Sequence, residues 1–174
     1  MAGFLKFLGI CNAAIWFGSL VFFTIAAGPA FFSPEMVALL GKPHAGAAAQ
    51  ILLARYFQIQ QVCALFALLH LTADWIYTGR PWNRYAVGLI AGILCAGMIG
   101  GYILQPKLKR LHLIMYAVQS TQSERDEAKQ QFGLLHGASQ VLNLGVLAGV
   151  LLYLWQVTRP DGYTRFVSGA KFRG

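Results

Sequence analysis

Charged side chains are scarce in this sequence, and acidic ones are the scarcest. Only 11% of the 174 residues are charged, and Asp and Glu together number six. Soluble domains carry about 25% charged residues, so this chain lacks the charge to cover a water-facing surface. Six carboxylates also leave little material for a mechanism that needs paired acids. The composition therefore argues against a soluble domain and against a carboxylate-pair enzyme.

Cysteine is also rare and is placed inside apolar runs. Cys11, Cys63 and Cys95 have no metal-type spacing with one another, and buried thiols behave as small hydrophobes. No disulfide framework is implied. Cys95 and Met98 could form a soft copper(I) pair, but the same spacing is common in helix packing. No acyl-transfer, phosphate-loop or metalloprotease motif occurs in the sequence, and we predict no cofactor and no metal.

The sequence is rich in hydrophobic residues. They account for 57% of the chain, and the mean hydropathy is +0.55. Four apolar runs are long enough to cross about 30 Å of hydrocarbon as helices. We therefore predict an all-α integral membrane four-helix bundle, formed by a single domain over 1–174. The expected spans are 4–27, 56–78, 85–105 and 131–157, followed by a basic interfacial tail over 158–174.

Two of the predicted helices are too long for the bilayer. The second is helix-compatible from Ala45 and the fourth from about Ser123, so both should extend beyond the bilayer on one side. A short interfacial helix over 34–40 is expected on that side, with Ser33 as its N-cap. Thr121 and Ser123 each precede an acidic residue by three positions, which is a capping pattern. These segments predict a helical cap on one face.

The net charge of +8 indicates lipid headgroups as the partner and not nucleic acid. Lys and Arg lie at the ends of the apolar runs instead of on one face, as topology and anionic lipids require. Seven Lys and Arg residues fall on each side of the membrane. The positive-inside rule gives most weight to those in short loops near the span ends. The tight turn with Arg80 and Arg84 and the basic tail therefore favour two cytoplasmic termini. We expect a multi-pass protein of a bacterial inner (cytoplasmic) membrane.

His70 and Asp74 are ionisable residues inside the second span, one helical turn apart. Such groups are costly in hydrocarbon, so each is a functional candidate. We consider two interpretations. The pair forms a proton relay or ion site, or it is an intramembrane ion pair that satisfies itself near the interface with help from Arg80 or Arg84.

A polar stripe in the fourth span is the second candidate site. Its members lie at steps of three, four and seven, and a polar stripe on a membrane helix must face protein or water. It can be interhelical packing or the wall of a polar cavity, with partners in the first two spans. The candidate residues are His136, Ser139, Gln140 and Asn143, with Asn12, Gln58 and Gln61 as the partners.

Histidine spacing limits haem and metal chemistry. His70 and His136 lie about 10 and 21 residues from the same membrane side, a depth difference of roughly 16 Å. One haem cannot bridge them, because its axial ligands must face each other at similar depth. His44, His112 and His136 all map toward the cap side and could make a metal site, although nothing in their spacing forces them together.

Small residues recur along the third span at steps of four. Such spacing lets helix backbones approach closely. We therefore predict a packing face made of Gly88, Gly92, Ala96 and Gly100.

Four short motifs in this order resemble the transmembrane protein 205-like family, also called domain of unknown function 4149. The motifs are Gly28-Pro29-Ala30-Phe31, Arg55-Tyr56-Phe57, Pro106 and Leu135-His136-Gly137-Ala138-Ser139. The resemblance covers nearly the whole chain and implies a four-helix membrane domain without an established activity, with a eukaryotic member associated with drug resistance. A more distant likeness reaches copper-resistance membrane proteins and haem-pathway membrane oxidases. Those families place a histidine in the first span, where this chain has none.

Three functional hypotheses follow. Abundant packing features and scarce catalytic ones favour a non-enzymatic accessory, assembly or scaffold subunit, with other membrane subunits or a second copy as partner. The alternative is transport of a small solute or metal ion through the polar cavity, which requires a wet path reaching His70 and Asp74. The third hypothesis is a haem- or redox-linked membrane enzyme.

Overall fold

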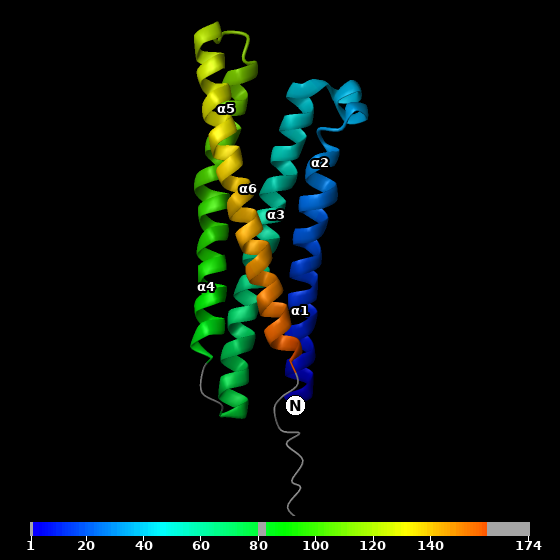
Figure 1. The fold of residues 1–174 in the computed structure, drawn as a ribbon, viewed down its shortest axis with the longest axis vertical. Helices are drawn as coiled ribbons and strands as arrows, with labels where there is room; N and C mark the ends of the chain where they lie inside the picture. The colour runs from blue at the N-terminus through cyan, green and yellow to red at the C-terminus, as the bar shows by residue number, and fades with distance from the viewer. Residues whose placement is uncertain (1, 80–82, 160–174) are drawn as a thin grey trace, which may run out of the picture.

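The fold is an all-helical bundle in which two long hairpins lie side by side (Figure 1). The first hairpin is formed by residues 2–79 and the second by residues 83–159. The computed structural model describes residues 2–79 and 83–159, and no strand occurs among them. The predicted tail beyond residue 159 and the turn residues 80–82 lie outside this part. The elements are α1 (Ala2–Phe22), η1 (Phe23–Ala27), α2 (Gly28–Ala30), α3 (Pro34–Thr78), α4 (Arg84–Met98), η2 (Ile99–Leu104), α5 (Gln105–Tyr116) and α6 (Gln122–Thr158).

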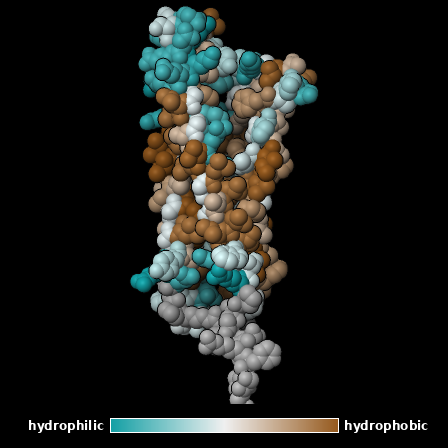
Figure 2. All heavy atoms as spheres, in the orientation of Figure 1, coloured by the Kyte–Doolittle hydropathy of each residue, from teal (hydrophilic) through white to brown (hydrophobic). Residues whose placement is uncertain are grey.

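Four continuous helical stretches are long and apolar enough to cross a membrane. They are Gly3–Ala30, Pro34–Thr78, Arg84–Tyr116 and Gln122–Thr158. Figure 2 shows a broad hydrophobic band across the middle of the face that it draws, with hydrophilic atoms above and below it. The predicted all-α four-helix fold is confirmed. With 45 and 37 residues, α3 and α6 exceed the roughly 20 residues that a bilayer needs, and both extend toward the same end.

The helix ends follow the predicted capping chemistry. The Ser33 hydroxyl accepts a hydrogen bond from the Met36 amide at 3.3 Å. Gly41 interrupts α3 with φ +73°, a conformation that glycine adopts without strain. Thr121 and Glu124 form a reciprocal capping box at the start of α6. The cap predicted from local sequence signals is therefore present.

Pro29 and Pro106 each follow a π-helical segment. Gly28 and Gln105, which directly precede Pro29 and Pro106, donate their backbone N–H to carbonyls five residues back. The hydrogen-bond ladder thus shifts its register where proline supplies no donor. The first helix consequently continues to Ala30, three residues beyond the end that the sequence predicted.

The half of the bundle that contains the N-terminus is solidly packed. Trp16, Leu20, Ile90, Val150 and Tyr153 are completely buried there. The rings of Trp16 and Tyr153 meet edge to face, with centroids 6.4 Å apart, a geometry that aromatic pairs favour. Four helices meet in this half: α1 and α4 each contact both α3 and α6.

The predicted glycine stripe contacts the bundle at one end only. Gly88 and Gly92 are exposed, with no atom within 4 Å of where a Cβ would lie, whereas a Cβ on Gly100 would meet the Phe57 ring. A row at steps of four drifts about 40° per step around a 3.6-residue helix, so four such positions do not share one face. The buried positions of α4 alternate steps of four and three instead: Ala86, Ile90, Ile93 and Gly97.

Gly100→Ala and Gly92→Ala should therefore differ in stability. Alanine favours a helix by up to about 1 kcal/mol over glycine, so Gly92→Ala should be neutral or stabilising. Gly100→Ala must displace the Phe57 ring, and overpacking costs about 1–3 kcal/mol. The free energy of unfolding, measured by titration with a denaturing detergent, should rank Gly100→Ala below Gly92→Ala. Equal values would contradict this placement of the stripe.

Candidate functional site

A cavity of about 590 Å³ lies between the hairpins, in the half of the bundle nearer the cap. Its walls come from the two π segments, from α2 and the turn that follows it, and from α3, α4, α5 and α6. Figure 2 shows hydrophilic atoms recessed between two ridges in the upper half of the face that it draws. Ligand pockets typically measure 300–1,000 Å³, so this cavity has the size of a small-molecule site.

The wall is mainly apolar, and no Asp, Glu, Lys or Arg is among the described residues that line it. Leucine and phenylalanine side chains from the two π segments, the turn after α2, α3, α5 and α6 form its largest apolar part. The polar members all bear amide, hydroxyl or imidazole groups. They are Thr24, Gln50, Tyr56, Gln60, Gln105, His136, Ser139, Gln140 and Asn143.

A hydrogen-bonded chain links three helices near the packed end of the cavity. The Tyr56 hydroxyl on α3 donates to Asn143 Oδ1 on α6, and Asn143 Nδ2 donates to Thr24 Oγ1 on η1 at 2.8 Å. The Phe23 ring stacks on Tyr56 with centroids 4.0 Å apart. Both polar atoms of the Asn143 side chain thus have a partner inside the protein, and the network ties together η1, α3 and α6.

Two glutamines on α3 differ from Asn143 because each leaves an atom unused. Gln50 Oε1 and Gln60 Oε1 are buried and have no hydrogen-bond partner among the described residues. Gln60 is only 3% exposed. More than nine in ten buried polar groups in proteins are paired. Of the seven described side chains with a buried unpaired atom, Gln50 and Gln60 are the two that line the cavity, where a guest that forms hydrogen bonds would satisfy them.

The mouth of the cavity opens between α2 and α6. The lining residues on α3 and α4 are buried or half-buried, whereas several on the other two elements are exposed. Phe32 and Leu144 are 58% and 56% exposed, and His136 and Gln140 are also exposed. His136 to Leu144 covers about 12 Å of helix, so the mouth is a lateral slot running down from the cap.

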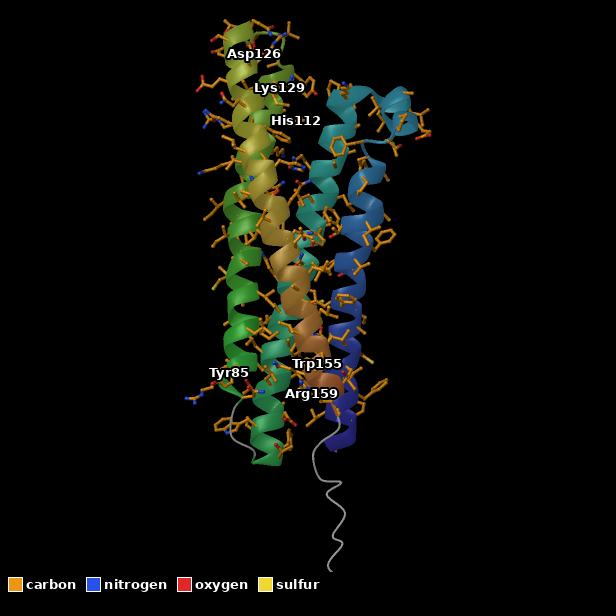
Figure 3. The ribbon with its side chains drawn as sticks, viewed as in Figure 1. Tyr85, His112, Asp126, Lys129, Trp155 and Arg159 are labelled. Carbon is orange, nitrogen blue, oxygen red and sulfur yellow. The ribbon has the colours of Figure 1, made fainter. Side chains whose placement is uncertain are left out.

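His112 closes the cavity region toward the cap. It is buried on α5, and a Cβ on Gly46 of α3 would collide with its imidazole. Figure 3 shows His112 high in the molecule, where α5 faces α3. The Phe132 ring lies 6.5 Å from His112 and stacks on His136 at 5.7 Å. An aromatic row thus leads from the helix contact to the mouth.

The cavity gathers the predicted stripe but not its predicted partners. His136, Ser139, Gln140 and Asn143 all line it. Asn12 donates instead to the Cys63 carbonyl at 3.0 Å, at the packed end. Gln58 accepts from Arg55 and Gln61 from Tyr102, and neither glutamine lines the cavity.

The partners that the sequence reasoning missed lie on the neighbouring face of the same helix. Gln50, Leu53, Tyr56 and Gln60 recur at steps of three and four, the signature of one helix face. Scoring the glutamines by this period would have separated Gln60 from its neighbours Gln58 and Gln61.

His70 and Asp74 do not form the predicted pair. His70 Nε2 lies 2.8 Å from the Leu5 carbonyl of α1, and its ring fills the space beside Gly9. No hydrogen bond or ion pair joins His70 to Asp74 among the described residues. The histidine turns toward α1 because Gly9 leaves room there. Within residues 2–79 and 83–159, no group of three His, Cys, Asp or Glu side chains could hold a metal ion.

The family model described as "Domain of unknown function (DUF4149)" matches residues 12–117. The chain belongs to this family. Comparisons with the curated proteins and with the solved structures gave no match. The matched part of this DUF4149 protein runs from α1 through α5, so it contains Tyr56 and Gln60. The α6 wall with His136 and Asn143 lies beyond it.

Replacing Asn143 by leucine should destabilise the bundle. The change leaves the Tyr56 hydroxyl without its acceptor and Thr24 without its donor, at a cost of about 1–3 kcal/mol. Tyr56→Phe should cost less, and the double variant should cost less than the sum, with a coupling of about 0.6 kcal/mol or more. Unfolding in denaturing detergent measures all three. Ser139→Ala is the control, since its hydroxyl bonds only the His136 carbonyl of its own helix.

Proposed function

We propose that this membrane protein binds a lipid-like small molecule in the cavity between its hairpins. The observation that carries the proposal is a cavity of about 590 Å³ with a mainly apolar, uncharged wall and unpaired glutamine acceptors. Sites of this kind bind ligands through apolar burial and orient them through a few polar groups. The lateral mouth between α2 and α6 suits a molecule that arrives through one leaflet.

Binding is favoured over conduction. The transport hypothesis required a path reaching His70 and Asp74, and neither residue lines the cavity. The lining ends near Gln60 and Val146, above the packed side chains of Trp16 and Tyr153. The haem- or redox-linked hypothesis gains less support, because His136 is the single histidine among the described residues of the cavity wall.

An accessory, assembly or scaffold role in a larger membrane complex remains a second candidate, with other subunits or a second copy as partner. One observation favours it: the exposed Gly88 and Gly92 leave open space on the outer face of α4, where another helix can approach closely. The transmembrane protein 205-like resemblance fits either role. Native mass spectrometry of protein extracted in mild detergent would detect a partner, and a lone monomer would argue against this role.

We further propose that both termini are cytoplasmic, in a bacterial inner membrane. Both ends of the described chain lie at the same end of the molecule (Figure 1). Arg159 stacks on Trp155 there, with 3.7 Å between the guanidinium carbon and the ring centroid, and Figure 3 places Tyr85 at the same end. Aromatic residues mark a membrane interface on either side, and Lys and Arg near a short loop are typical of the cytoplasmic one.

Alkaline phosphatase fusions test this orientation, because the enzyme is active only outside the cytoplasm. A fusion after residue 174 should be inactive, and one inserted at Gln119 in the connection between α5 and α6 should be active. The reverse pattern would overturn the orientation and leave the cavity proposal untouched.

Ala49→Phe should reduce the amount of co-purifying lipid. Ala49 lines the cavity, and a ring placed there overlaps the ligand at a cost of about 1–3 kcal/mol, or roughly tenfold in affinity. Ala47→Phe is the matched control, since Ala47 is exposed on the same helix and outside the cavity lining. Mass spectrometry of lipid extracts from purified protein gives the bound amount per chain. Equal amounts in the two variants, or none in the wild type, would refute the proposal.

A further inference from the structure

We infer that the ligand of this cavity is an uncharged long-chain lipid whose head carries a hydroxyl group that donates a hydrogen bond to Gln60. The inference rests on the proposed binding function and adds the chemical class of the head.

The absence of charge on the wall selects against a charged head. Every polar group that lines the cavity is an amide, a hydroxyl or an imidazole, and no carboxylate, lysine or arginine is among them. A charge moved into such a wall has no counter-ion, and burying an unpaired charge is far costlier than burying a hydroxyl. A fatty-acid anion or an ammonium lipid would therefore have to stay at the mouth.

Gln60 calls for a hydrogen-bond donor. Its side chain is 97% buried and lines the cavity, and its Oε1 has no partner among the described residues. The Tyr56 hydroxyl one turn away on α3 does not serve it, because that hydroxyl donates its single proton to Asn143. A buried acceptor left alone is unfavourable. A hydroxyl on the ligand would satisfy it.

The apolar wall then receives the tail. From Gln60 to Ala49 the lining covers eleven residues of α3, or roughly 16 Å. Phe57, Leu53 and Leu104 line this length, and Phe32 and Leu144 stand exposed at the mouth. A head at the floor would place the tail along these apolar side chains and out between α2 and α6.

Five probes with the same sixteen-carbon chain separate these requirements. They are hexadecane, 1-hexadecanol, 1-methoxyhexadecane, hexadecanoate and hexadecyltrimethylammonium. The methyl ether keeps the oxygen acceptor of the alcohol and lacks its donor. Competition for the full-length protein in nanodiscs, read by native mass spectrometry, should rank hexadecanol about tenfold or more above the ether. Both charged probes should bind more weakly than hexadecanol.

Gln60→Met should abolish the preference without closing the cavity. Methionine has a similar shape and no acceptor for a hydroxyl, so hexadecanol and the ether should bind the variant equally, and hexadecane at least as well as it binds the wild type. Gln61→Met is the matched control, because Gln61 bonds Tyr102 away from the cavity. Thermal unfolding of each variant checks that it is folded. If Gln60→Met fails to fold, the ranking of the five probes by the wild-type protein still tests the inference.

The outcomes separate the two proposals. Equal binding of hexadecane, the ether and hexadecanol by the wild type, together with a loss caused by Ala49→Phe, would overturn the hydroxyl inference and support the cavity function. Tightest binding of a charged probe would overturn the uncharged class. If Ala49→Phe changes the binding of no probe, the cavity function itself is refuted.

Discussion

The hydrogen bonds at Asn143 are the interaction on which the shape of this protein depends. They join η1, α3 and α6 at one level, and on one side of that level the helices pack while on the other they leave a cavity. Hydrocarbon offers no alternative partners to a buried amide or hydroxyl. The three helices therefore remain tied at this level although their apolar side chains do not fill the space beside it.

Helical irregularity shapes the same half of the bundle. Both π segments line the cavity, and each is followed by a proline that shifts the backbone register. π segments inside helices are rare and frequently occur at functional sites. At the cap, His112 lies against Gly46 and holds α5 to α3. The cavity is thus bounded by a hydrogen-bonded level and by a ring-to-glycine contact.

The polar residues of the spans differ in what surrounds them. Asn12 and Asn143 find partners in neighbouring helices, and such bonds contribute modestly to helix association. Several described side chains, the His70 imidazole and the Tyr153 hydroxyl among them, keep a buried atom without a partner, but of these only Gln50 and Gln60 line the cavity. These two glutamines carry the binding proposal, because a buried polar atom without a partner is costly and a molecule in the cavity would satisfy it.

The sequence by itself determined the helical class, the four spans and the cap, because hydropathy, proline and capping residues act within a few positions of the chain. It also placed the stripe from His136 to Asn143 on one face. Only the tertiary structure decided which face of α3 meets that stripe, that His70 turns to α1, and that Gly88 and Gly92 point outward. These outcomes depend on the rotation of each helix against its neighbours, and in a span that is apolar all round no periodicity encodes that rotation.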